Sequence, residues 1–171
     1  MDAITSPTRV LETGFNHELA RLARRYCELI ETRPTSRGAW LTRIAELLPR
    51  LHAGVSSLRV VERRLLDRLE PVDLDARFEL FGQLRDLLAD HDAYWLEFDS
   101  AAEGMATMTG SLADDLTDIY CELKQGLTLF ELDPDSAAAA WALGYEQHWG
   151  QHLVDAERHL AMLRAQSRLD P

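Results

Sequence analysis

The sequence predicts an all-α protein, a single helical bundle of five to six helices with up-down packing and a long C-terminal helix. Leucine and alanine dominate the apolar residues, whereas the β-branched residues typical of strands are few. Apolar residues recur at intervals of three and four, and no stretch alternates apolar and polar residues between turn-forming pairs. At 171 residues, the chain suits one domain with its own core.

In the first half of the chain, apolar stripes predict successive helical segments. The first spans about 16–31, and the second begins near Ser36. Pro49 lies inside the second stripe, so we expect a kink or break there, because proline lacks the N–H that a helix interior uses. A charge-rich helical segment at 58–69 and a helix at about 75–89 follow.

The second half of the chain contains the clearest helix signals. An aromatic segment at 91–98 and a loop at 99–110 precede Ser111, which we expect to cap a helix. Asp133 then provides a cap, and Pro134 a favourable first helical residue, for one long final helix. A short connection between these two helices predicts that they pack antiparallel.

The domain boundaries follow from where the apolar stripes begin and end. We expect a flexible N-terminus at 1–11, a single α-helical domain at 12–166 and a flexible tail at 167–171. Cys27 and Cys121 lie within apolar helical patterns, so they indicate buried, inert thiols in a reduced compartment.

Several single residues carry local expectations. In the aromatic segment, Tyr94, Trp95 and Phe98 are expected in the core, and Asp92 is expected to cap a helix turn. A glycine inside a helix costs about 1 kcal/mol relative to alanine. Gly150 therefore indicates either the close approach of another backbone or a ligand, or simple tolerance.

The charge of the chain excludes some classes of partner. Its 18 basic and 29 acidic residues give a formal net charge of −11 and a pI near 4.9. Because phosphate binding needs a basic surface, we expect no nucleic-acid partner. No apolar run approaches the roughly 18 residues of a membrane span, and no signal-peptide pattern is visible. We therefore expect a cytoplasmic protein with no membrane partner.

Two polar stripes run along the last two predicted helices. The first stripe is acidic and consists of Asp115, Asp118 and Glu122. The second stripe consists of His148, His152, Asp155 and His159. At about 100° per residue, each stripe covers about 60° of arc and is rotated in the same sense from its apolar stripe. If the two helices pack through their apolar stripes, both polar stripes line one side of the pair.

Three interpretations of this polar side stay open. It is a solvated helix face, a structural network of buried His–Asp pairs, or a functional site for a metal ion or a polar ligand. In the third case, the candidate ligand-binding residues are Asp115, Asp118, Glu122, Trp149, His152 and Asp155.

The candidate metal ligands are His148, His152 and Asp155, because two imidazoles one turn apart and nearby carboxylates suit a divalent ion. Asp155 can instead orient a histidine as its hydrogen-bond partner. Known metal motifs do not match. Position 149 is Trp, so the general base of a His-Glu-x-x-His metalloprotease is missing, and no Glu-x-x-His occurs.

Three segments resemble the DUF5063 family, bacterial helical proteins of unknown function. They are 92–99, 112–127 and 148–158, and the resemblance is best over 90–163. It implies a compact helical domain and no particular activity. The matching positions are Asp115, Asp118, Tyr120, Lys124, Trp149, Gly150, His152 and Asp155. The chain departs from the family pattern at Glu122, where an aspartate is expected, at His159, which precedes Leu160 rather than following it, and at His148.

No catalytic motif is present, so the sequence favours a non-catalytic helical module that binds a protein or a small ligand, with no predicted cofactor. The alternative is a metal-binding or metal-dependent protein that uses the His/Asp side of the last two helices. Self-association through amphipathic helices, giving a homo-oligomer, is a third hypothesis.

Overall fold

The computed structural model describes residues 7–58, 73–96 and 108–169. Its helices are α1 (Pro7–Glu31), α2 (Arg37–Ser56), α3 (Leu74–Leu88), α4 (Leu112–Phe130), α5 (Pro134–Gly144) and α6 (Gly150–Ala165). The short elements are a 3₁₀ turn η2 (Ala89–His91), two strands β1 (Ala93–Leu96) and β2 (Met108–Ser111), and a π-helical turn η3 (Tyr145–Trp149). The predicted helical bundle is confirmed.

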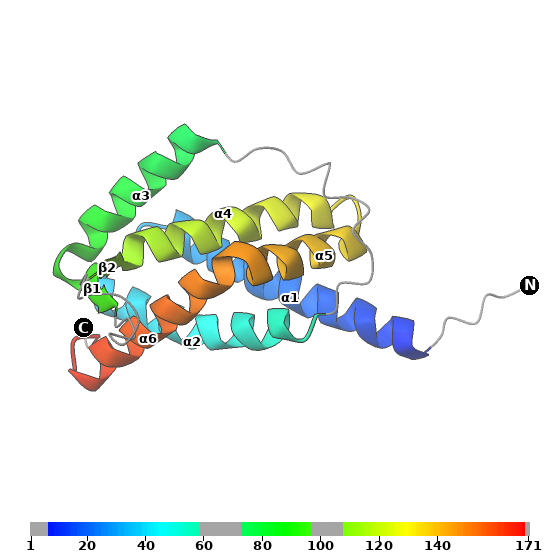
Figure 1. The fold of residues 1–171 in the computed structure, drawn as a ribbon, viewed down its shortest axis with the longest axis horizontal. Helices are drawn as coiled ribbons and strands as arrows, with labels where there is room; N and C mark the ends of the chain where they lie inside the picture. The colour runs from blue at the N-terminus through cyan, green and yellow to red at the C-terminus, as the bar shows by residue number, and fades with distance from the viewer. Residues whose placement is uncertain (1–6, 59–72, 97–107, 170–171) are drawn as a thin grey trace, which may run out of the picture.

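Helix α4 is the central element of the bundle, and α1, α3, α5 and α6 all pack against it (Figure 1). Helix α2 packs against α1 and α6, and α3 lies on the outside of the bundle, where it packs obliquely against α4 (Figure 1). The apolar stripe of α4 is fully buried and consists of Leu112, Leu116, Ile119 and Leu123. The buried hydroxyl of Tyr26 on α1 donates to the carbonyl of Leu116 at 2.9 Å, which fixes α1 against α4.

The expected helix caps form. The Ser111 hydroxyl accepts from the Asp114 amide at 3.3 Å, and the Asp133 carboxylate accepts from the Asp135 amide at 3.2 Å. Asp92 is a cap too, but of a helix distant in sequence. Its Oδ1 accepts from the Ala113 amide at 2.7 Å, so it satisfies a donor at the start of α4.

The expectation that the chain has no strands is wrong. β1 and β2 form an antiparallel pair in which Ala93 faces Ser111. Each strand has four residues, too few for an alternating pattern to stand out in the sequence. The pair also turns Trp95 outward, so this side chain is 68% exposed rather than in the core, while Tyr94 is buried. Phe98 lies outside the described residues.

One helix prediction needs correction. The break expected at Pro49 does not occur, because fully buried Leu48 and Leu51 hold α2 against the core despite one missing hydrogen bond. The predicted long final helix is confirmed as one helical run from Pro134 to Ala165, in which the π turn η3 lies between α5 and α6. The helical segment expected at 58–69 falls almost entirely outside the described residues.

The ends of the domain also differ from the expectation. α1 begins at Pro7, well before residue 16. At the other end, Leu169 is buried, and the Arg168 guanidinium pairs with Asp90 at 3.1 Å. The Arg168 carbonyl accepts from His91 Nε2 at 3.0 Å. Residues 167–169 are therefore packed against η2 rather than free.

The thiols are poor nucleophiles, as predicted. Cys27 is buried and Cys121 is partly buried. Burial raises the pKa of the Cys27 thiol to about 12 and that of the Cys121 thiol to about 11, so very little thiolate exists near neutral pH. In the described part of the chain, no helix combines the length and the apolar character of a membrane span.

Gly126 marks the close approach of α4 and α5. A Cβ atom at this position would lie 1.9 Å from Nε1 of Trp141, which is buried. We expect Gly126→Ala to lower the free energy of unfolding by about 1–3 kcal/mol through overpacking. The control is Gly82→Ala on α3, where a Cβ would meet open space and helix propensity predicts a gain of about 0.5–1 kcal/mol. Urea denaturation measures both, and equal effects would contradict this account of the α4–α5 contact.

Candidate functional site

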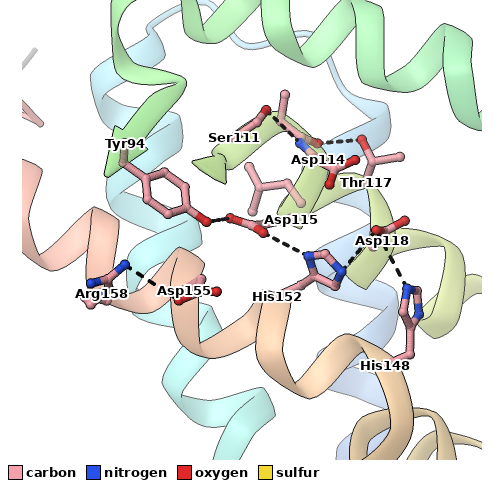
Figure 2. Close-up of polar contacts among 12 residues, drawn as sticks. Tyr94, Ser111, Asp114, Asp115, Thr117, Asp118, His148, His152, Asp155 and Arg158 are labelled. Atoms are coloured by element: carbon pink, nitrogen blue, oxygen red, sulfur yellow. Dashed lines mark hydrogen bonds and ion pairs between the residues drawn. The ribbon is translucent and has the colours of Figure 1, made fainter. Parts of the chain in front are cut away.

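The candidate site centres on two buried carboxylates of α4. Asp115 and Asp118 lie three residues apart, on the side of the helix that faces α6 and α3, and are only 4% and 5% exposed. A buried carboxylate is costly unless it is paired and hydrogen-bonded. Both side chains have such partners, which come from three different elements of the fold. Figure 2 shows the contacts of Tyr94 and His152.

Asp115 is held on both of its oxygens. The Tyr94 hydroxyl on β1 donates to Oδ2 at 2.5 Å, and His152 Nδ1 on α6 donates to Oδ1 at 2.9 Å. Burial raises the pKa of Asp115, and the hydrogen bonds from His152 and Tyr94 oppose that rise. The same hydrogen bond to Asp115 raises the pKa of His152. Because a carboxylate only accepts, the proton of this contact belongs to Nδ1 of the imidazole.

Asp118 divides its two oxygens between different partners. Its Oδ1 accepts a hydrogen bond from Nε of Arg77 on α3 at 2.8 Å, and Nη2 of the same guanidinium forms an ion pair with it at 2.6 Å. Its Oδ2 faces two imidazole nitrogens, Nε2 of His152 at 3.3 Å and Nε2 of His148 at 3.9 Å. The Arg77 guanidinium also reaches Oδ1 of Asp114 at 3.2 Å.

The His148 imidazole is held in the same manner as that of His152. Its Nδ1 donates to Oε1 of Glu122 at 3.0 Å, and its side chain is about half exposed. The two rings lie 5.2 Å apart and nearly perpendicular. Each imidazole thus has Nδ1 fixed by a carboxylate and Nε2 turned toward Asp118 Oδ2 (Figure 2). One ligand atom from each of Asp118, His148 and His152 lies within 4.8 Å of the others.

The contact between His152 Nε2 and Asp118 Oδ2 has a chemical consequence. If His152 is neutral, its Nδ1 carries the proton, and Nε2 then presents a lone pair to a carboxylate oxygen. Two acceptors at 3.3 Å repel one another. A second proton on the imidazole or a cation between the two atoms relieves this repulsion. The site therefore favours a positive charge between α4 and α6.

The π turn η3 leads into the histidine-bearing stretch of α6. Its last hydrogen bond runs from the Gly150 amide to the Tyr145 carbonyl, and a Cβ at Gly150 would lie 2.3 Å from that oxygen. The presence of a glycine at position 150, inside a helix, therefore has a structural cause: the chain's own backbone approaches this position closely. Gly144 has a similar role, because a Cβ there would lie 2.6 Å from Oε2 of Glu122. Turns of this kind are frequent at functional sites.

Some predicted site residues lie elsewhere. Asp155 is directed toward Arg158 at 3.8 Å and is not among the three grouped ligand atoms (Figure 2). Trp149 is fully buried and its indole donates to the Trp141 carbonyl at 3.2 Å, so no face is left for a ligand. His159 is buried against Tyr94, with ring centroids 4.7 Å apart, and its Nε2 donates to the His91 carbonyl at 2.8 Å.

Two residues that complete the site were not predicted from the sequence. Arg77 lies 41 positions before Asp118, and nothing near it in sequence signals this pairing. The sequence predicts Tyr94 only as a core aromatic. A buried tyrosine hydroxyl needs a polar partner, and this requirement points to a contact such as the one with Asp115. Two other positions that match the family pattern, Tyr120 and Lys124, instead converge on Glu31 at 2.8 and 2.5 Å.

The raised pKa of His152 predicts a pH-dependent stability in chelator-containing buffer. Its protonated form stabilises the fold fully below the unfolded-state pKa of about 6.5, and this contribution is lost as the pH rises through the raised folded-state pKa. We expect His152→Gln to lower the free energy of unfolding by about 1 kcal/mol more near pH 6 than at high pH. This is about the amount by which a hydrogen bond to a charged group exceeds a neutral one. Thermal denaturation across pH 6–10 measures this, with His17→Gln on exposed α1 surface as control. A loss of stability in His152→Gln that grows with pH would contradict this expectation.

Comparisons with known proteins agree with the fold. Among solved structures, the crystal structure of protein BF1032 from Bacteroides fragilis superimposes with a TM-score of 0.70 at 21% identity, over 94% of this chain and 97% of that one. At this identity the likeness shows a shared fold. A search of curated proteins finds no match. The family model of DUF5063, a domain of unknown function, matches residues 11–166, so the chain belongs to the DUF5063 family.

Proposed function

We propose that this protein is a helical module that binds one divalent transition-metal ion between α4 and α6. The ligands are Oδ2 of Asp118 and Nε2 of His148 and of His152. One observation carries the proposal: both Nε2 atoms converge on the same carboxylate oxygen, while each Nδ1 is held by a separate carboxylate. The proposal joins the small-ligand module predicted from the sequence with the metal alternative, and replaces Asp155 by Asp118 as the third ligand.

The distances suit a metal of small radius. Ligands bound at about 2.0–2.1 Å in a tetrahedron lie about 3.3 Å from one another. The His152–Asp118 pair already has this separation at 3.3 Å, and the His148–Asp118 pair, at 3.9 Å, needs only a small movement of a half-exposed side chain. Two imidazoles and one carboxylate suit Zn²⁺, and also Fe²⁺ when further positions stay open.

The surrounding contacts are those of a metal site. Metal-bound histidines commonly donate their second ring N–H to a carboxylate, which fixes the tautomer and the ring orientation. Asp115 supplies this contact to His152, and Glu122 supplies it to His148. Tyr94 in turn holds the other oxygen of Asp115. Three protein ligands leave at least one coordination position, next to a half-exposed His148, for water or a small molecule.

The first prediction from this proposal concerns metal content. Untagged protein purified without chelator should contain close to one metal ion per chain by elemental mass spectrometry. Asp118→Asn and His152→Ala should each lose most of that metal, because each removes one of three ligands. His17→Ala, which changes an exposed histidine of α1, should keep it. Metal-free protein that gives no thermal shift with Zn²⁺, Mn²⁺ or Fe²⁺ would make the polar network a purely structural one.

The second prediction concerns the residue that orients His152. Asp115→Asn removes the carboxylate that fixes the Nδ1–H tautomer, and we expect it to weaken Zn²⁺ binding by about 10–100-fold. Tyr94→Phe should have a smaller effect in the same direction, because it acts through Asp115. The matched control is Tyr120→Phe, whose hydroxyl contacts Glu31 away from the site. Isothermal titration with Zn²⁺ measures all three, and an unchanged affinity in Asp115→Asn would show that the orienting contact is dispensable.

A further inference from the structure

We infer that Arg77 is a built-in counter-cation that competes electrostatically with the metal ion for Asp118, so that metal binding loosens the docking of α3 on α4. The inference rests on the proposed function and goes beyond it, because it makes the docking of α3 dependent on metal binding at the site. Asp118 has two different partners: its Oδ1 pairs with Arg77, whereas its Oδ2 faces the two imidazoles.

The charge balance of the site supports this competition. Arg77 is the cation that pairs with Asp118 in the described structure, and its side chain is only 24% exposed, so solvent screens it weakly. A divalent ion on Oδ2 brings a second positive charge close to the guanidinium on Oδ1 of the same carboxylate. The two cations repel one another and share one negative charge. Each therefore lowers the affinity of Asp118 for the other.

The packing of α3 makes Arg77 important for its docking. The two fully buried apolar residues of this helix, Leu84 and Leu88, both lie in its C-terminal half. In the N-terminal half, Leu74 and Phe78 are 63% and 62% exposed. Arg77 lies between them and reaches Asp114 and Asp118 of α4. Leu80 and Phe81, near the middle of the helix, are only partly buried against the core. The ion pairs of Arg77 therefore contribute to holding the first turns of α3 on α4, and they include the proposed metal ligand.

Coupling between two binding equilibria is reciprocal. If the Arg77–Asp118 pair weakens metal binding by a given factor, metal binding weakens the docking of Arg77 by the same factor. The site then has two states. In one, Asp118 is paired with Arg77 and α3 is docked, and in the other, the metal holds Asp118 and the first turns of α3 are loosened.

The affinity test uses three arginine variants titrated with Zn²⁺. We expect Arg77→Gln to bind Zn²⁺ more tightly than the natural protein, within the roughly 5–150-fold range of coupled sites. Arg77→Lys keeps the positive charge, so its Zn²⁺ affinity should lie closer to that of the natural protein than the affinity of Arg77→Gln does, which separates charge from packing. Arg85→Gln makes the same charge change at an exposed position of the same helix and should have no effect.

Hydrogen exchange of the natural protein gives an independent readout that needs no variant. With Zn²⁺ present, amides in the first two turns of α3 (74–80) should exchange faster, whereas those of α1 should not change. Binding that is unchanged or weaker in Arg77→Gln, or slower exchange of α3 with Zn²⁺, would overturn the role of Arg77 while leaving the metal site intact. If neither the natural protein nor Arg77→Gln bound Zn²⁺, Mn²⁺ or Fe²⁺, the proposed function would fall, and this inference with it.

Discussion

The burial of Asp115 and Asp118 in the centre of the bundle is the constraint on which the rest of the polar network depends. Carboxyl groups at 4% and 5% exposure cannot rely on water, so the protein must supply donors and positive charge. Tyr94 from β1, His152 from α6 and Arg77 from α3 all meet this need. Three elements distant in sequence are thereby held on one helix, α4.

The two carboxylates differ in the partners of their oxygen atoms. Asp115 is satisfied on both oxygens within the protein, and burial still raises its pKa, so its role is to hold His152. Asp118 has one oxygen on Arg77 and the other facing His148 and His152. At that oxygen, the proposed metal ion would compete with a proton, because both neutralise the approach of an imidazole nitrogen to a carboxylate. The hydrogen bond to Asp115 raises the pKa of His152, so the network favours a positive charge on that imidazole.

The helix irregularity beside the site is part of the same arrangement. The π turn at Tyr145–Trp149 divides α5 from α6, and glycines stand at both of its borders. Gly144 leaves room for Glu122, and Gly150 leaves room for the Tyr145 carbonyl. Glu122 can then contact His148, one turn before His152. A larger side chain at either glycine would disturb the geometry at the entrance to the site.

The sequence by itself determined the helical class, the caps at Ser111 and Asp133, and the two polar stripes that meet between α4 and α6. Periodicity and capping are local properties, read over a few residues, so they survive without knowledge of the fold. It did not determine the short β pair, the π turn or the partners Tyr94 and Arg77. The β pair and the two partners arise from contacts between residues 12 to 41 positions apart, and the π turn depends on how closely Gly150 approaches the Tyr145 carbonyl. Only tertiary packing decided that Asp118, rather than Asp155, faces the histidines, because side-chain direction there depends on which helix lies opposite.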